Sequence, residues 1–426
     1  MFFVGDDWAS DHHDLVVIDD AEKVLARARV LVGPDGITQF AETLARAAVK
    51  AAGRQHRRGS RSVEEQVADL DPDQVMVCIE VDHGPWVQAL AATGYHVFGV
   101  DPLQAKRFRE SFGSSGAKSD PGDALALAEM VRSRHHTLTE VGGDTAQVTA
   151  IKILARAHQR AVWDRTRYAN RLRAALREYF PMILLICSEF NWSLHDRTVI
   201  GILMKAPTPD QAAKLTVRQL LPLLKRRQNK DAKAARIQQI LRSSQLEVAP
   251  EIVQAYAINV AATVRTIVRV NDQITELEEQ VGAHFSEHPD AEIYLSQPGV
   301  GLVVGARLCG EYGDDRTRFR SAKARRNFSQ TSPITIQSGK SKIVCARAAG
   351  NDWLLDATFR QANAAILNDP YCYAYYRKQR DRGAEHNAAL RQLANKLVGI
   401  LHGCLARHQQ YNPAIAWAHA SISVAA

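Results

Sequence analysis

Four carboxylates are spaced along the first 130 residues in a pattern that could hold a divalent metal ion. Asp7 ends the first predicted strand, Glu80 lies near the end of a central apolar strand, and Asp120 and Asp123 lie three residues apart on one predicted helix. Residues at that helical spacing share a face. Oxygen ligands suit Mg²⁺ (or Mn²⁺), and two such ions can stabilise the attacking and leaving oxygens of phosphoryl transfer. We therefore expect a metal site for phosphoryl-transfer chemistry.

Each of these acids also has an ordinary structural interpretation. Strand ends and helix starts often carry acids, and Asp120 would interact favourably with a helix dipole. A buried strand normally excludes Glu, so Glu80 needs a partner or a metal. Singly, each acid is better explained by its structural role, and the four together favour a site. Asp6 is a rival to Asp7, since alternation along the strand puts the two on opposite faces of the sheet. Two weaker rivals are Asp82 and Asp101.

Almost all of the charged residues of one predicted helix in the middle of the chain are positive. From Lys152 to Arg177 there are eight Lys or Arg residues and one acid, Asp164, with Trp163 and Tyr168 interleaved. Solvated helix faces usually mix the two signs, so phosphate binding by guanidinium groups with release of counterions is the better interpretation. The candidate nucleic-acid-binding residues here are Arg156, Arg160, Arg167 and Arg171.

A second basic stretch, residues 316–347, contains nine Lys or Arg residues and no acid. Within it, Ser338 is followed by Gly339, Lys340 and, two residues later, Lys342. A serine beside glycine and lysines suits attack on a phosphodiester, because glycine lets a backbone approach closely and lysines stabilise charge that develops on phosphorus. The same string is also typical of a flexible basic loop. Lys340 and Lys342 are candidate phosphate ligands in either interpretation.

The elements that must position the carboxylates form a predicted mixed α/β domain over residues 1–140. Strands that pair as a hairpin come first, and strands that alternate with helices follow, which indicates a mixed sheet. Strands are predicted at 2–7, 13–18, 28–32, 75–81 and 95–100. Helices are predicted at 37–52, 86–92 and 120–134, and residues 54–62 read as a basic loop.

Residues 141–290 are predicted to be a long helical coiled-coil region. Apolar residues keep heptad spacing over 151–179, where Pro181 ends the run, and again over 256–281. Two antiparallel helices of one bundle and an intermolecular coiled coil explain this spacing equally well. Residues 205–245 resemble a separate basic helical insert.

Residues 291–426 are predicted to form a mostly helical third domain. It opens on Pro298-Gly-Val-Gly301, which resembles the turn of a helix-hairpin-helix motif whose glycines expose backbone N–H groups to phosphate. A helix-capping turn is the alternative. A long helix over residues 387–408 closes the domain.

Composition limits the class of protein. The 426 residues imply two or three domains, and the net charge of +8 is concentrated in the basic stretches described above. The six cysteines show no CxxC spacing, which argues against a zinc ribbon or a disulfide framework. No signal peptide is recognisable, and no apolar run is long enough to span a bilayer. We expect a prokaryotic, cytoplasmic protein that is associated with the nucleoid and not with a membrane.

The order of these motifs resembles the DEDD-type insertion-sequence transposases, a family of serine recombinases guided by a bridge RNA. The matching N-terminal strings are VGDDWA (4–9), IE (79–80), GPW (84–86), VDP (100–102) and KSDPGDA (118–124). The matching C-terminal strings are PGVG (298–301), RF (318–319), SP (332–333), SGK (338–340) and GN (350–351), followed by Tyr376 and Gly383. The resemblance therefore covers both ends of the chain.

The resemblance implies a RuvC-like, RNase H-type fold for the N-terminal domain. Asp7, Glu80, Asp120 and Asp123 would be its metal-binding tetrad, and the Gly-x-Asp order favours Asp7 over Asp6. Ser338 would be the nucleophile of the C-terminal transposase domain and would form a transient phosphoserine link to DNA. Double-stranded DNA at the element ends and target, a guide RNA, and further copies of the chain in a dimer or tetramer would be the partners.

The chain departs from the family pattern in two places. Asp6 stands where a branched apolar residue is usual, and Ser329-Gln-Thr-Ser-Pro333 stands where a glycine–leucine type of turn is commoner, which affects the local shape around Ser338. Three other functions are weighed against the recombinase. They are a metal-dependent nuclease of the Holliday-junction resolvase type, in which water attacks; a non-catalytic nucleic-acid scaffold; and, least supported, a tyrosine recombinase.

Overall fold

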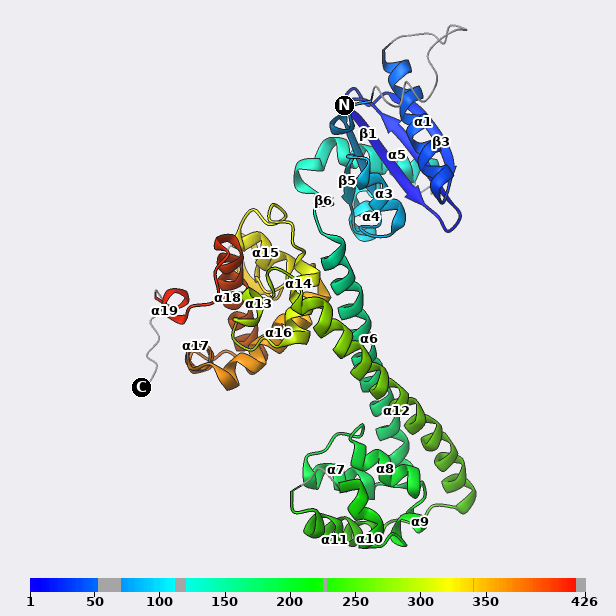
Figure 1. Ribbon diagram of the computed structural model, residues 1–426, viewed down its shortest axis with the longest axis vertical. Helices are drawn as coiled ribbons and strands as arrows, with labels where there is room; N and C mark the ends of the chain where they lie inside the picture. Colours follow the sequence, from blue (N-terminus) through cyan, green and yellow to red (C-terminus); the bar gives the residue numbers. More distant parts are fainter. Residues whose placement is uncertain (53–69, 112–119, 225–227, 340, 419–426) are drawn as a thin grey trace. The chain divides into compact units, whose positions relative to one another are not determined.

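The computed structural model describes residues 1–52, 70–111, 120–224, 228–339 and 341–418 (Figure 1). The predicted basic loop at 54–62 and Lys340 lie outside these residues. The chain divides into two compact units: an N-terminal unit of residues 1–144 with 315–318, and a C-terminal unit of residues 145–314 and 319–426. The predicted boundary at residue 140 lies close to this division, and the predicted middle and C-terminal regions share one unit.

The N-terminal unit is built on a six-stranded mixed sheet in the order β3-β2-β1-β4-β5-β6. The central pairs β1–β4 and β4–β5 are parallel, and the pairs β1–β2, β2–β3 and β5–β6 are antiparallel. The strands are β1 (Phe2–Trp8), β2 (His12–Ile18), β3 (Val24–Leu31), β4 (Val75–Ile79), β5 (His96–Gly99) and β6 (Thr139–Val141). The predicted α/β class is confirmed, and β6 is an addition to the predicted strands.

Helices cover both faces of this sheet. On one face, α1 (Pro34–Ala51) and α3 (Pro85–Ala92) pack on an apolar cluster that includes Val4 and Leu15. On the other, α4 (Pro102–Glu110) and α5 (Asp120–Arg134) pack on a cluster that includes Phe3 and Val16. Helix α5 crosses β1 at Gly5, where a Cβ atom would lie 1.8 Å from the carbonyl oxygen of Ala124. Only glycine permits this close approach.

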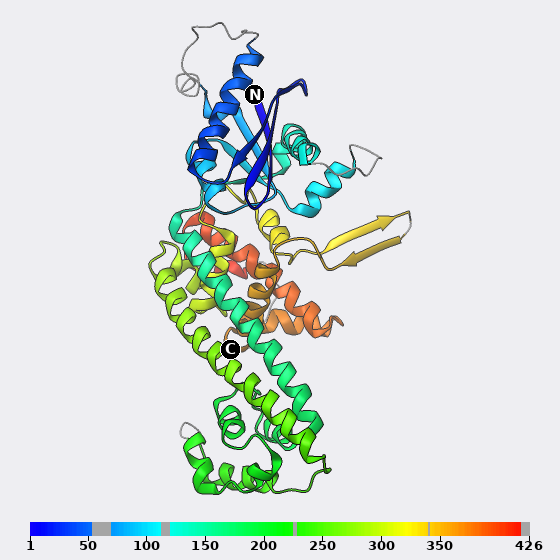
Figure 2. The same cartoon turned by 90° about the vertical axis from the view of Figure 1, so that its right-hand side faces the viewer.

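Two long helices form the spine of the C-terminal unit. Helices α6 (Ala146–Tyr179) and α12 (Pro250–Ser286) run side by side (Figures 1 and 2). Their buried seam residues, such as Leu172 on α6 and Val264 on α12, belong to one apolar cluster. The heptad spacing is therefore satisfied within one chain, as the bundle interpretation predicts.

A group of shorter helices fills the end of this spine where α6 stops and α12 begins. They bury Ile183, Ile202 and Ile237 in the same apolar cluster as the spine. The elements are α7 (Met182–Phe190), α8 (Arg197–Lys205), α9 (Pro209–Ala213), α10 (Val217–Leu220), η3 (Leu221–Leu224) and α11 (Lys230–Leu241). The insert therefore begins before the predicted residue 205, because the apolar residues of α7 and α8 pack with it.

The rest of the C-terminal unit, in its described residues, is helical apart from one β-hairpin. Its helices are α13 (Ala291–Leu295), α14 (Leu302–Tyr312), α15 (Ala322–Phe328), α16 (Asp352–Asn368), α17 (Pro370–Asp381), α18 (His386–Arg407) and α19 (Pro413–Ala416). The Pro298–Gly301 turn joins α13 to α14, as predicted. Gly299 has φ +72°, and a Cβ atom there would lie 2.3 Å from the carbonyl oxygen of Gln361 on α16. In the described residues, no helix is long and apolar enough to cross a membrane.

Candidate active site and nucleic-acid interface

Asp7 lies near the end of β1, and Glu80 directly follows β4, the parallel strand to which β1 is hydrogen-bonded. The β1–β4 register pairs Asp6 with Ile79, so Asp7 and Glu80 are the next residues along each strand. Gly5 packs on α5, and alternation places Asp7 on that same face of the sheet. Burial raises the pKa of the Cys78 thiol, and the negative charges of Glu80 and Asp6 raise it further. Because Cys78 belongs to the α5-side apolar cluster, Glu80 exerts its charge close to that face.

Asp123 reaches the same region from α5. It precedes Ala124, whose carbonyl oxygen abuts Gly5 on β1, and its carboxylate is buried. Arg109 on α4 neutralises it through an ion pair of 2.7 Å. Asp120 begins α5, and its side chain is outside the described residues. Asp7, Glu80 and Asp123 are thus carried to the α5 face of the sheet by three different elements.

The described side chains do not by themselves form a closed metal site. Among them, no group of three or more His, Cys, Asp or Glu residues is arranged to hold a metal ion. The donor chemistry fits a hard divalent cation, because the three acids supply oxygen ligands on one face of the sheet. Arg109 provides the positive charge that a buried Asp123 requires.

Asp14 is a further acid beside Asp7 that the sequence analysis missed. The β1–β2 register places it directly opposite Asp7. Arg29 donates two hydrogen bonds to its carboxylate, at 2.9 and 2.7 Å, and His12 lies 3.4 Å away. These hydrogen bonds, with Arg29 and His12 adding their charge, hold the pKa of Asp14 below its usual value. The only signal in the sequence is an acid that precedes a continuous apolar run in β2.

The rival Asp6 has a different role on the opposite face. Its carboxylate is fully buried and lies 2.7 Å from the Nδ1 atom of His13. It also accepts a hydrogen bond of 2.7 Å from the indole N–H of Trp86, and the His13 ring stacks on Trp86 with centroids 3.9 Å apart. A buried carboxylate with two such partners is satisfied, so this network explains an acid where an apolar residue is usual.

The two weaker rivals also have local structural roles. The Asp101 side chain accepts a hydrogen bond of 2.8 Å from the Leu103 backbone N–H and so caps α4. Asp82 is solvent-exposed and lies 2.8 Å from the Nδ1 atom of His83. Of the acids at the strand ends, Asp7 and Glu80 are therefore the two that the sheet places side by side.

Ser338 lies at the tip of an exposed β-hairpin formed by β7 (Ile334–Ser338) and β8 (Ser341–Cys345). The last register pair before the turn is Ser338 with Ser341, and Gly339 adopts φ +54°, which suits a tight hairpin. The hairpin extends away from the helices of its unit (Figure 2). Lys342 is exposed on β8, and no residue in the described part of the chain hydrogen-bonds the Ser338 hydroxyl.

The unusual turn before this hairpin is held by buried polar contacts. Gln330 has φ +57°, a backbone conformation that residues other than glycine rarely adopt. Its side-chain amide donates a hydrogen bond of 2.7 Å to Asp352, and the neighbouring Ser329 hydroxyl lies 2.7 Å from the Tyr312 hydroxyl. These contacts offset the strained backbone and fix the base of the hairpin.

The basic residues of α6 divide into two groups. Arg156 makes a bidentate ion pair with the buried Glu311, at 2.6 and 2.9 Å, and so joins α6 to α14. Arg160 is exposed and lies over Trp353, whose ring stacks on Trp163. The other two candidate nucleic-acid-binding residues on α6 are also exposed: Arg167 pairs with Asp164, and Arg171 lies over Tyr168. The contacts of Arg156 favour a structural role, and the other three guanidinium groups face solvent.

A mixed sheet with acids at the ends of adjacent central strands and on a covering helix is consistent with an RNase H-like metal-dependent fold. Two family descriptions match the chain: "Transposase", of the DEDD type found in IS110, over residues 4–181, and "Transposase IS116/IS110/IS902 family" over residues 291–377. A DEDD-type domain implies the use of a divalent metal.

Curated relatives cover nearly the whole chain. A mini-circle putative transposase for IS117 from Streptomyces coelicolor is 37% identical over 98% of this chain and 96% of its own length. The uncharacterized 42 kDa protein of insertion element IS900 from Mycobacterium paratuberculosis is 25% identical over 95% of each chain. The uncharacterized 43.6 kDa protein of IS110 from S. coelicolor is 29% identical over 77% of this chain and 82% of its own. The chain belongs to the IS110/IS116 family of insertion-sequence transposases, enzymes that cleave and rejoin DNA.

Proposed function

We propose that this transposase breaks and rejoins DNA strands through Ser338, with Mg²⁺ (or Mn²⁺) held by Asp7, Glu80, Asp120 and Asp123. The observation that carries the metal assignment is that Asp7 and Glu80 each directly follow the last register pair, Asp6 with Ile79, of the parallel strands β1 and β4. The carboxylates of Asp7, Glu80 and Asp123 would bind the cation on the α5 face of the sheet. When bound, that cation would stabilise negative charge on the attacking and leaving oxygens.

The position of Ser338 supports its assignment as the nucleophile. In the proposed step, its Oγ atom loses a proton and forms a bond to phosphorus, while the bond from phosphorus to one strand oxygen breaks and that oxygen takes up a proton. The hydroxyl of an incoming strand then attacks the phosphoserine and restores the Ser338 hydroxyl. An exposed hairpin tip lets the serine reach a phosphodiester, and Lys340 and Lys342 would neutralise the phosphate.

The proposal also includes partners that the exposed surfaces favour. Arg160, Arg167 and Arg171 would bind phosphates of DNA or of a guide RNA along α6. Ile336, Ile343 and Val344 leave apolar surface exposed on the hairpin. An isolated two-stranded hairpin is only marginally stable in water, so we expect a second copy of the chain or the bound nucleic acid to cover it. A dimer or tetramer of the chain is the proposed active form.

Substitution of Ser338 tests the proposal. Ser338→Ala should abolish excision and rejoining while DNA and RNA affinity stay at the wild-type level. Ser341→Ala, on the facing strand, is the matched control and should retain activity. Full recombination by Ser338→Ala would reject the serine assignment.

A water-dependent nuclease of the resolvase type is the second candidate function. One observation favours it: in the described residues, no side chain is placed to take a proton from the Ser338 hydroxyl. In that mechanism the carboxylate site alone would cleave DNA. Strand cleavage without rejoining, and unaffected by Ser338→Ala, would support the nuclease over the recombinase.

A further inference from the structure

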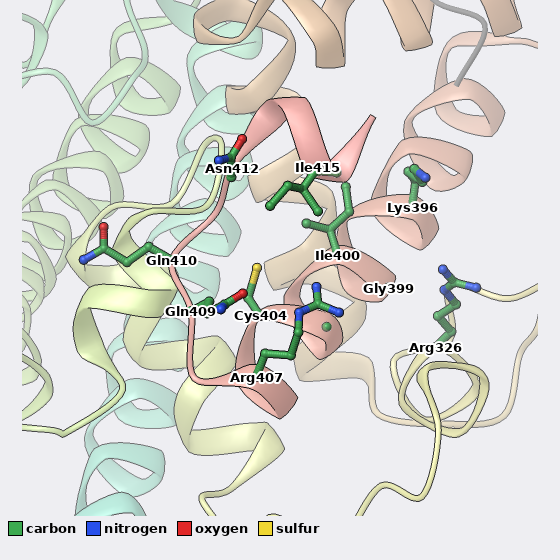
Figure 3. A pocket seen from close by; sticks show the side chains of 12 residues that line it. Arg326, Lys396, Gly399, Ile400, Cys404, Arg407, Gln409, Gln410, Asn412 and Ile415 are labelled. Carbon is green, nitrogen blue, oxygen red and sulfur yellow. The ribbon is translucent and has the colours of Figure 1, made fainter. Parts of the chain in front are cut away.

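A pocket in the C-terminal unit lies between α15, α18 and the segment that leads into α19 (Figure 3). Its volume is about 250 Å³. Pockets for whole drug-sized ligands are usually about 300–1,000 Å³, so this one suits a smaller group. The pocket belongs to neither the carboxylate site nor the Ser338 hairpin.

Three cationic side chains line the pocket, and none of its lining residues is acidic. Arg326 comes from α15, and Lys396 and Arg407 come from α18. Within the described ranges, no carboxylate forms an ion pair with any of the three. Burial lowers the pKa of Lys396, and the nearby charge of Arg326 lowers it further. The Nζ atom of Lys396 also lies over the ring of Trp417, 5.4 Å from its centroid. Like charges that line one pocket repel one another, and an anion among them would reduce that repulsion.

Arg326 has one buried donor without a partner, and its guanidinium packs closely on α18. The Nε atom of Arg326 is buried and has no hydrogen-bond partner in the described structure. Its guanidinium lies over Gly399, where a Cβ atom would be only 1.8 Å from Nη2. Glycine at this point of α18 therefore creates the space that the guanidinium occupies. A buried donor without a partner normally requires a ligand or water.

We propose that this pocket binds a backbone phosphate of the nucleic acid on which the enzyme acts. A phosphate fits the size of the pocket, its unpaired positive charge and its planar guanidinium donors. The amide side chain of Gln409 would contact the adjoining sugar or base, whereas Gln410 donates a hydrogen bond to Glu292 and Asn412 caps α19. This inference rests on the proposed function in one respect, that the C-terminal unit binds DNA or RNA. It adds a phosphate-binding site outside both the carboxylate site and the Ser338 hairpin.

The salt dependence of binding tests the proposal. Binding of the full-length protein to a random-sequence DNA duplex and to a single-stranded RNA of equal length would be measured over a series of salt concentrations. Each phosphate contact contributes about 0.9 to the slope of log K against log salt for a duplex and about 0.7 for a single strand. Arg326→Gln and Lys396→Gln should each reduce the slope by about that amount for the nucleic acid that occupies the pocket. A smaller slope with the duplex alone would show that the phosphate in the pocket belongs to DNA. A smaller slope with the RNA alone would show that it belongs to RNA.

Two further variants keep the test specific. Gly399→Ala retains every charge but displaces the Arg326 guanidinium, so it should lower the slope as Arg326→Gln does. Alanine favours a helix more than glycine does, so α18 should still form in this variant. Lys106→Gln on α4 removes an exposed charge elsewhere and should leave the slope unchanged. Unchanged slopes in all three pocket variants would overturn the inference. Because only binding is scored, a wild-type protein that fails to cleave DNA would count against the proposed function and not against this pocket.

Discussion

Asp123 on α5 and Arg109 on α4 form a 2.7 Å ion pair on the sheet face that carries Asp7. The Asp123 side chain is 8% exposed and that of Arg109 is 31% exposed, so the pair is partly shielded from water. A metal bound by Asp123 would supply the positive charge that Arg109 supplies in this structure. Arg109 and the metal would then act on the same carboxylate.

Replacement of Arg109 should make stability depend on the metal. Arg109→Gln leaves a buried carboxylate short of a partner, at a cost of about 1–3 kcal/mol. Mg²⁺ should recover more stability in this variant than in the wild type, because it replaces the missing charge. Thermal unfolding with and without Mg²⁺ measures both effects. An equal Mg²⁺ response in the two proteins would contradict a metal at Asp123.

The neighbouring residues Asp6 and Asp7 should respond differently to the same substitution. Asp7→Asn should abolish strand cleavage with little loss of stability. Asp6→Asn should lower the free energy of unfolding by about 1–3 kcal/mol, because it disturbs a fully buried network with His13 and Trp86. Cleavage assays and chemical denaturation on both variants separate the roles. The reverse pattern would make Asp6 the metal ligand.

Arg156 and Arg171 lie on the same helix but should affect different properties. Arg156→Ala breaks the ion pair with the buried Glu311 and should destabilise the protein by roughly 3 kcal/mol. Arg171→Ala should leave stability unchanged and lower the salt slope of nucleic-acid binding by about one unit. Denaturation and binding titrations on each variant provide the comparison. Equal stability losses would show that the helix face of Arg171 is also packed.

Asp14 should make the N-terminal unit sensitive to acid. Arg29 lowers the pKa of Asp14 below the ordinary value of 3.8, so the ionised carboxylate stabilises the fold above that pH. This stabilisation is lost as the pH falls through the lowered pKa. Arg29→Gln should flatten the acid limb of the stability–pH profile measured by denaturation. An acid limb as steep as that of the wild type would show that Arg29 does not stabilise the Asp14 carboxylate.

The sequence predicted the main strands of the sheet well because they are short apolar runs. β4 reads as a continuous apolar run because both of its faces are buried. β6 was missed because it has only three residues, Thr139–Val141, at the edge of the sheet. Helix α4 was also missed, although Asp101 followed by Pro102 is a readable start signal.

Interactions between distant residues could not be predicted from local pattern. Asp6 and Trp86 are 80 residues apart, and Arg156 and Glu311 are 155 apart, so no spacing rule links either pair. A basic helix face has the same composition whether its guanidinium groups bind phosphate or a buried carboxylate. The heptad spacing of α6 and α12 is likewise the same whether the two helices pair within one chain or with a second chain. The fold shows that they pair with each other within one chain.

Strand exchange through Ser338 requires a transient covalent link between Ser338 and DNA. Reaction of the full-length protein with end-labelled DNA, stopped by denaturation and resolved on a denaturing gel, measures that link directly. The wild type and Ser341→Ala should give a labelled protein–DNA adduct, and peptide mass spectrometry should locate the phosphate on Ser338. Ser338→Ala should give none. Cleaved DNA without any adduct in the wild type, or an adduct that persists in Ser338→Ala, would contradict the account.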